Sequence, residues 1–385
     1  MTIDFDKVQI KKKLGAGMFG TTYLANYNNR QYALKIQHIL KSDIKKDFKN
    51  ELWRELDVYS YINKLNKTDQ IFFTRLHGIS IYDKCDHEQI RPFKVNFGDK
   101  KDKFAQQLKK LDESDWCVKY LLDYKGTKTL NDFAMSHKIT AKLAYSFMLQ
   151  ISKIILVLYE GGYSHNDLHG GNIMIYKTDK KYFNFYGKKI PTMGYQLSAI
   201  DYGRAVHKKF PKTRDTPGLF INNRKQWMFS EIYASTQNII NRIALFIADC
   251  KKQNKKLPWE RGGNIFSDAT KKMLDKHYDF CNEIKTKYIK LFPNAENLVN
   301  YVIKNRRSGK MVNNMVFRKK YEGDFWDVIN RMVDEFSLNY PEQYMKYWKW
   351  CSYHKYIIPK SDAIDLLMTN NARDYINKLI DKIEK

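Results

Sequence analysis

The segment 163–175 restricts the possible structure and chemistry of this chain more than any other part of its sequence. Its letters, YSHNDLHGGNIMI, describe a polar turn that follows a helical pattern and runs into an apolar strand. Asp167 can accept the proton of an attacking hydroxyl group, and Asn172 can bind a metal ion from the same loop. The segment therefore predicts a catalytic loop that combines a general base with a metal ligand.

The two histidines of this segment allow a different interpretation. His165 and His169 have the spacing at which a helix presents two metal ligands on one face. The two glycines that directly follow His169 oppose a helix at this position. We therefore expect His165 to be a structural residue that packs the loop.

A glycine-rich segment near the N-terminus, GAGMFG, gives the second signal. Glycines at this spacing let a hairpin lie close to phosphate groups, where a side chain would block the approach. The pattern alone is also typical of dinucleotide sites and of ordinary hairpins, but here it joins two predicted strands rather than opening a helix. The residues predicted to cover a nucleotide are Leu14, Gly15, Ala16, Gly17, Met18, Phe19 and Gly20.

Three charged residues complete the pattern. Lys35 ends an alternating apolar strand and is expected beneath the glycine-rich segment, where it can hold phosphates as a point charge. The next helix offers Glu51 and Glu55 as its partner, one turn apart, and we prefer Glu55 because apolar residues follow it at helical spacing. Asp201 follows the predicted strand 196–199 and precedes a glycine turn, so it is placed to bind Mg²⁺.

Each element alone has an ordinary interpretation, but their order along the chain is that of the protein-kinase signature set. From about Val8 to Gly203 the chain resembles the eukaryotic-type protein kinases, and its HNDLH sequence is similar to that of haspin-like kinases and kinases of large DNA viruses. The resemblance implies an α+β, bilobal fold with a small antiparallel β-sheet lobe, one main helix in that lobe, and a larger, mainly helical lobe. The lobes would comprise residues 1–124, with a polar insertion at about 83–115, and residues 125–385.

The resemblance also implies an active serine/threonine protein kinase that uses ATP with Mg²⁺, or with Mn²⁺ in its place. Its acceptor would be a protein hydroxyl group, and its metal ligands would be Asn172 and Asp201. The expected catalytic residues are Asp167, Lys35, Glu55 and His169. Further nucleotide contacts are expected from Thr22, Ala33, Leu122 (the gatekeeper residue), Asp123 and Tyr124.

Several positions depart from the family pattern. Asn166 stands where most members have an arginine that reads a phosphate on the activation segment, so control by that phosphate is in question. His169 replaces the lysine typical of serine/threonine kinases. The segment 228–232 looks like a degraded form of the element that ends the activation segment, and Asn241 is the best match for the aspartate of the following helix.

Two other classes of protein share parts of this pattern. Small-molecule phosphotransferases of the aminoglycoside and choline kinase type have a very similar HxDLHxxN loop, but they usually lack a well-formed glycine-rich loop. A pseudokinase scaffold normally loses one of the three charged positions that Lys35, Asp167 and Asp201 occupy here. Both remain alternatives to the protein kinase.

The formal net charge of +26 favours acidic partners such as phosphates, nucleic acid or acidic peptides. Abundant lysine, asparagine, isoleucine and tyrosine are equally typical of an AT-rich genome, and the lysines are spread along the chain. The basic aromatic segment 344–350 could bind nucleic acid, but aromatic residues at helical spacing more often belong to a core. We therefore expect an acidic protein substrate rather than nucleic acid.

The remaining composition bears on compartment and redox state. No apolar run approaches the ~20 residues that span a bilayer, and the N-terminus has no signal-peptide core. The expected location is the cytoplasm or nucleus, or the host cell or virion if the source is viral. The five cysteines are scattered without a CxxC pair, which predicts reduced thiols rather than a disulfide framework or a zinc knuckle.

Overall fold

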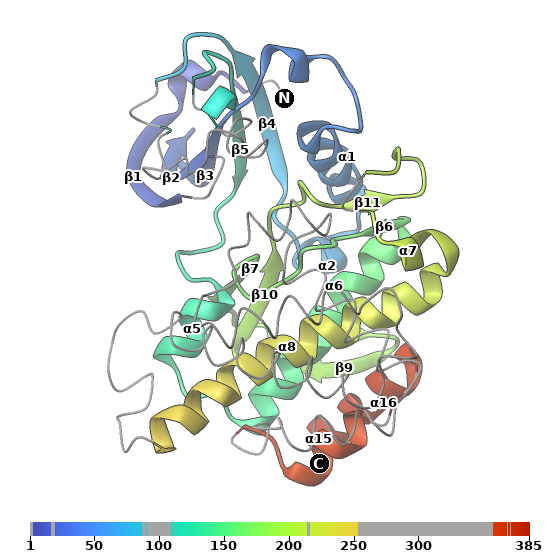
Figure 1. Cartoon of the computed structure of the whole chain (residues 1–385). Helices are drawn as coiled ribbons and strands as arrows, with labels where there is room; N and C mark the ends of the chain where they lie inside the picture. The colour runs from blue at the N-terminus through green and yellow to red at the C-terminus, as the bar shows by residue number, and fades with distance from the viewer. Residues whose placement is uncertain are drawn as a thin grey trace, which may run out of the picture. The chain divides into compact units, whose positions relative to one another are not determined.

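The computed structural model describes residues 3–16, 20–86, 90, 109–111, 113–213, 216–252, 357–367, 369 and 371–385 (Figure 1). This part of the chain is α+β and divides into two compact units, each described by itself. The first unit takes its described residues from Met1–Leu130, Lys153–Lys180 and Gly194–Thr213, and the second from Asn131–Ser152, Lys181–Met193 and Arg214–Lys385. The predicted division into 1–124 and 125–385 stays a prediction.

A five-stranded antiparallel sheet with the order β1-β2-β3-β5-β4 forms the N-terminal part of the first unit (Figure 1). Asn28 and Asn29 both have positive φ angles, 48° and 58°, so they form the tight turn between β2 and β3 that matches the strand twist. The strands are β1 (Gln9–Ala16), β2 (Gly20–Tyr27), β3 (Arg30–His38), β4 (Leu76–Tyr82) and β5 (Cys117–Asp123).

Helix α1 (Glu51–Lys64) follows the third strand, as the apolar spacing predicts. The Asn50 side chain caps its first turn by accepting a hydrogen bond from the Leu52 N–H at 2.8 Å. Leu52, Glu55, Val58 and Tyr59 lie on its buried face, at the three- and four-residue spacing of one helix face. The helix therefore carries Glu55 inward, whereas the Glu51 side chain is 47% exposed.

Short elements complete the first unit. Two two-stranded ladders, β6 with β11 and β7 with β10, follow in its C-terminal segments. The remaining elements of this unit are η1 (Phe5–Lys7), η2 (Lys41–Ile44), α2 (Lys67–Gln70), β6 (Tyr163–Ser164), β7 (Ile173–Lys177), β10 (Tyr195–Ala199) and β11 (Val206–His207).

The described residues of the second unit are mainly helical, and they include one hairpin that the sequence did not predict, β8–β9. Its core includes an aromatic group of Phe229, Tyr233 and Tyr375, and the Tyr375 hydroxyl lies 2.7 Å from the Thr236 hydroxyl. Most residues of the following elements belong to it: α5 (Leu130–Ser136), β8 (Tyr182–Phe185), β9 (Lys188–Pro191), α7 (Gly218–Asn222), α8 (Arg224–Lys252), α15 (Lys360–Leu367) and α16 (Ala372–Glu384).

Helix α8 corrects one expectation about this region. It begins at Arg224, so the segment 228–232 lies inside a helix rather than ahead of one, and Asn241 belongs to the same helix. The apolar spacing of 228–247 continues through the segment, with Met228, Phe229, Ile232, Ile243 and Ile247 all buried, and this explains the continuous helix. The segment 344–350 lies outside the described residues.

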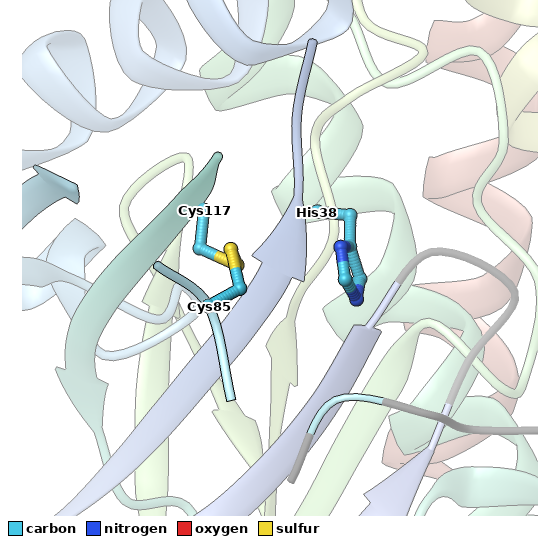
Figure 2. A group of neighbouring side chains, drawn as sticks. All are labelled: His38, Cys85 and Cys117. Atoms are coloured by element: carbon cyan, nitrogen blue, oxygen red, sulfur yellow. A yellow bond between two sulfur atoms is a disulfide. The ribbon is translucent and has the colours of Figure 1, made fainter. Parts of the chain in front are cut away.

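Two cysteines contradict the prediction of reduced thiols. Cys85 and Cys117 form a disulfide, with their Cα atoms 5.7 Å apart (Figure 2). Strand pairing places Tyr82 opposite Cys117, and the Cys85 N–H donates to the Asp115 carbonyl at 3.0 Å. The disulfide thereby joins the two ends of the 83–115 insertion. The two cysteines are 32 residues apart, so the sequence did not indicate that they pair.

Helix α6 (Ala141–Glu160), which contributes to both units, is the one helix of the described part that is long and apolar enough to cross a membrane. Within the fold, 83% of its most apolar stretch is buried. Such burial is typical of a core helix and makes its length and composition weak evidence for a membrane span.

Candidate active site

Two strand ladders bring the predicted catalytic loop and the Asp201 turn together. Ser164 pairs with Val206 in the ladder β6–β11, and Ile173 pairs with Ala199 in the ladder β7–β10. The loops 165–172 and 200–205 are therefore held together at both ends, at one end by the ladder β6–β11 and at the other by the ladder β7–β10. The Ile200 N–H also donates to the Asn172 carbonyl at 3.0 Å, which binds the two loops to each other.

Lys35 joins residues that are distant in the sequence. Its Nζ atom lies 3.0 Å and 3.2 Å from the two carboxylate oxygens of Glu55 and 3.3 Å from Oδ1 of Asp201. Burial opposes the charged form of Lys35, but Asp201 and Glu55 more than offset it, so the pKa of the ammonium is raised. Lys35 in turn lowers the pKa of Asp201. The Lys35 ammonium is thus a cation held between the carboxylates of Glu55 and Asp201.

Buried tyrosines surround the Lys35–Glu55 pair. The Tyr59 hydroxyl donates to Glu55 at 3.3 Å, and the Lys35 ammonium lies 5.4 Å from the centre of the Tyr120 ring. The Tyr202 ring meets Tyr59 edge to face at 5.2 Å. Burial raises the pKa of the Glu55 carboxyl, and the Lys35 charge opposes this rise. Because these aromatic side chains exclude water, the ion pair is largely desolvated.

The catalytic loop forms a compact network around Asp167. The Asn172 side chain donates to the Asp167 carbonyl at 3.0 Å and to its carboxylate at 3.4 Å. Arg204 lies 3.6 Å from the same carboxylate, and the Asn166 side chain donates to the Arg204 carbonyl at 3.2 Å. Nδ1 of His169 accepts from the Gly171 N–H at 3.0 Å, so this ring orders the turn.

Two non-glycine residues of the loops have left-handed backbone conformations: φ is 60° at Asn166 and 63° at Asp201. Such angles cost energy and occur where surrounding contacts hold the chain. Beside Asp201, the buried Tyr202 hydroxyl donates to the Ala199 carbonyl at 2.6 Å, and Nε2 of His165 lies 3.0 Å from the Ile200 carbonyl. Burial lowers the pKa of His165, which is consistent with a neutral, structural ring.

The sheet presents the predicted nucleotide residues on one face. Thr22 is paired with Lys35, and Ala33 is paired with Leu122, so these four side chains point to the same side. At Gly20 an added Cβ would lie 2.2 Å from the Ile36 carbonyl, so only glycine fits there. Leu14, Gly15 and Ala16 end β1, whereas Gly17, Met18 and Phe19 lie outside the described residues.

Asp123 and Tyr124 follow the Leu122 position. The Asp123 N–H donates to the Arg75 carbonyl at 3.0 Å, and its carboxylate receives hydrogen bonds from Arg75 at 2.9 Å and 3.1 Å. His77 lies 2.7 Å and Lys125 3.6 Å from the same carboxylate. These contacts tie the end of β5 to β4 and fix the segment where the resemblance places the adenine-binding backbone.

We expect the replacement Asp123→Asn to lower the free energy of unfolding at pH 7 by roughly 1.5–3 kcal/mol, the usual range for a hydrogen bond to a charged group. Although burial favours the protonated form, His77 and Arg75 lower the pKa of Asp123 well below its usual value. The stabilisation is therefore present above the unfolded-state pKa, about 3.9, and is lost as the pH falls through the folded-state value. Urea unfolding at several pH values measures this.

The difference between wild type and Asp123→Asn should consequently shrink as the pH is lowered from about 5. Asp83→Asn, at an exposed position just after β4, is the matched control and should change stability little. A difference that is independent of pH would contradict the assigned role of the charge.

Sequence reasoning missed some residues of this site. Arg204 directly follows the Asp-Tyr-Gly turn, and this position could have indicated that its side chain lies near the catalytic loop. Tyr59 lies one helical turn after Glu55, a spacing that also places it on the Glu55 face. Nothing in the sequence pattern indicated Arg75 and His77, because their contacts with Asp123 arise only from the pairing of β4 with β5.

The chain matches no protein-family model, and a search of the curated proteins found no match. Asp167, hydrogen-bonded by the Asn172 amide, can orient a hydroxyl group and accept its proton, and the partly exposed Lys35 cation can offset the charge of phosphate oxygens.

Proposed function

We propose that this chain is an ATP-dependent serine/threonine protein kinase of the protein-kinase superfamily, with the bilobal fold of that class. One observation carries the proposal: Lys35 contacts both Glu55 and Asp201, although Asp201 lies 166 residues away in the sequence. The Lys35–Glu55 ion pair is the one that the signature set requires of its lysine and helix glutamate, and the Lys35–Asp201 contact brings the candidate metal-binding carboxylate beside that pair.

In this proposal each residue of the site has a separate task. Lys35 offsets phosphate charge, and Glu55 fixes the position of Lys35. Asp167 accepts the proton of the attacking hydroxyl group, with Arg204 and Asn172 holding its carboxylate. Most of the rate enhancement would come from positioning and from charge compensation rather than from covalent chemistry.

The residues present also fit a magnesium ion. Asp201 and Asn172 offer a carboxylate and an amide oxygen, which are the hard donors that Mg²⁺ prefers, and the Asp201 side chain is 54% exposed. When bound there, the ion would neutralise developing charge on the phosphate oxygens. Mn²⁺ accepts the same donors and is the expected substitute.

Phosphate transfer from γ-labelled ATP in the presence of Mg²⁺ tests the proposal. The acceptors are casein, histone, the protein itself, a panel of amino sugars, and choline. We expect labelled serine or threonine in protein, and a loss of about 10²–10³-fold when Asp201 is replaced by Asn. Adding a chelator should abolish transfer, and adding back Mg²⁺ or Mn²⁺ should restore it.

The outcomes separate the three classes of function. Transfer only to a small molecule would assign the chain to the phosphotransferases of the aminoglycoside and choline kinase type. Nucleotide binding without transfer to any acceptor would favour the pseudokinase scaffold. Comparing acidic with basic peptides would test the preference for acidic substrates, a preference proposed from the net charge of +26.

A further inference from the structure

A cluster of His38, Cys85 and Cys117 lies at the base of the insertion (Figure 2). His38 is the last residue of β3 and is paired directly with Cys117, the first residue of β5. Cys85 follows the end of β4. The side chains are almost fully buried, with 6% of His38, 8% of Cys85 and 0% of Cys117 exposed. Three separate segments therefore place an imidazole beside two sulfurs in the interior.

The donor atoms of this cluster are those of a metal site. One ligand atom from each of the three residues lies within 4.8 Å of the other two. Thiolate sulfur and imidazole nitrogen together are the preferred donors of zinc and of other thiophilic ions. A disulfide needs only the two sulfurs, so it does not account for the imidazole of His38 beside them, whereas a metal site would use it as a third ligand.

The surroundings of the cluster favour the same chemistry. Nδ1 of His38 lies 3.0 Å from the Ser114 carbonyl, which can only accept, so Nδ1 carries the proton and Nε2 the lone pair. A hydrogen bond of this kind orients metal-binding histidines in known sites. The Asp115 carbonyl oxygen lies 2.9 Å from Sγ of Cys85.

We propose that His38, Cys85 and Cys117 form a binding site for a thiophilic metal ion, Zn²⁺, when the two cysteines are reduced. Reduction by a thiol or a phosphine adds two electrons and two protons to the sulfur pair and breaks the S–S bond. Binding of Zn²⁺ then releases both protons as two S–Zn bonds form. Disulfides are rare in the cytoplasm and nucleus, so the metal-bound form would be the one expected there.

Such a site would fasten the insertion to the sheet. Ile90, inside the insertion, accepts a hydrogen bond from Thr21 of β2 at 3.2 Å through its carbonyl and belongs to the same buried cluster as Cys85 and Cys117. His38 and Lys35 are an odd number of residues apart on β3, so they lie on opposite faces of the sheet. The metal site is therefore separate from the candidate active site, and the proposal does not depend on kinase activity.

The experiment uses the full chain, reduced with a phosphine, freed of metal with a chelator and then exposed to Zn²⁺. Metal analysis after gel filtration should find about one tightly bound zinc per chain. In the same wild-type sample, alkylation followed by peptide mass spectrometry should find Cys85 and Cys117 protected by zinc, and Cys281 equally alkylated with and without it. This measurement needs no variant and so does not depend on variant folding.

Three variants and the oxidised protein complete the test. Cys117→Ser and His38→Asn should weaken zinc binding by more than about tenfold, and Cys281→Ser, which removes a thiol elsewhere in the sequence, should leave it unchanged. Protein whose disulfide is intact should bind no zinc at this site. With Co²⁺ in place of zinc, reduced wild type should show thiolate-to-metal charge-transfer absorption.

Reduced protein that binds no zinc, or that binds it without protecting Cys85 and Cys117, would overturn the proposal. The pair would then be a plain disulfide or dithiol. Zinc protection of the two cysteines that His38→Asn leaves unchanged would remove the imidazole from the ligand set, and the proposal as stated would fail.

Discussion

Replacing Asp167 by Asn is expected to lower kcat for phosphate transfer by about 10²–10⁴-fold, the usual contribution of a general base. The amide keeps the size of the carboxylate but cannot accept the proton of the hydroxyl group. Asp167 is partly exposed, and its backbone carbonyl retains the hydrogen bond from Asn172, so folding and nucleotide affinity should change little. Steady-state kinetics with a protein acceptor and a separate titration with ATP measure the two effects.

Asp179→Asn is the matched control, because this exposed aspartate lies just after β7, in the same unit, and has no part in the proposed chemistry. Its kcat should equal that of wild type. Wild-type kcat in Asp167→Asn, with transfer still dependent on Mg²⁺, would show that another group accepts the proton.

Replacing Lys35 by Met is expected to have two consequences of different origin. The first is a loss of about 2–4 kcal/mol in the free energy of unfolding, since Glu55 is left buried without its cation. We take a range slightly below the usual one because a fifth of the Lys35 side chain is exposed to solvent. The second is a drop in kcat/KM of about 10²–10³-fold, because a fixed charge opposite the phosphates is lost.

The double variant Lys35→Met/Glu55→Leu separates these two consequences. Removing both charges should recover part of the lost stability, since an apolar pair of similar volume replaces an unpaired buried carboxylate. Activity should stay as low as in the single variant. Urea unfolding and kinetics on the same samples provide both values.

Lys12→Met, at an exposed position of β1, is the control for loss of a lysine from the sheet and should alter neither quantity strongly. A double variant that regains activity would contradict the charge role assigned to Lys35. One that is no more stable than Lys35→Met would mean that the Tyr59 hydroxyl, which donates to Glu55, dominates the cost.

Part of the candidate site could be predicted from the sequence because it depends on local chemistry. A turn with two glycines between a helix and an apolar strand restricts the backbone at 163–175, and the residue types within it restrict what the loop can do. The choice between Glu51 and Glu55 also followed from periodicity, since apolar spacing decides which face of α1 is buried. Both signals depend on residues close together in the sequence, so they can be recognised without knowledge of the tertiary structure.

Other features depend on strands that meet only after folding. Arg75 and His77 reach Asp123 through the pairing of β4 with β5, and no spacing along the chain shows that contact. The resemblance assigned 228–232 to the end of the activation segment and Asn241 to the following helix, whereas both lie in the single helix α8, through which the apolar spacing continues. In that case a family pattern outweighed the periodicity, and the periodicity was the better guide.

Local patterns in the sequence therefore predicted the α+β class, helix α1 and the turn of the catalytic loop, because each depends on neighbouring residues and on backbone conformation. The contacts of Lys35 with Glu55 and Asp201, and the meeting of Cys85 and Cys117 beside His38, appear only in the folded chain. The first arrangement depends on side chains of β3, helix α1 and the loop after β10 that meet only in the folded chain. The second depends on antiparallel strand pairing, which places His38 opposite Cys117 and brings Cys85, just after β4, close to both.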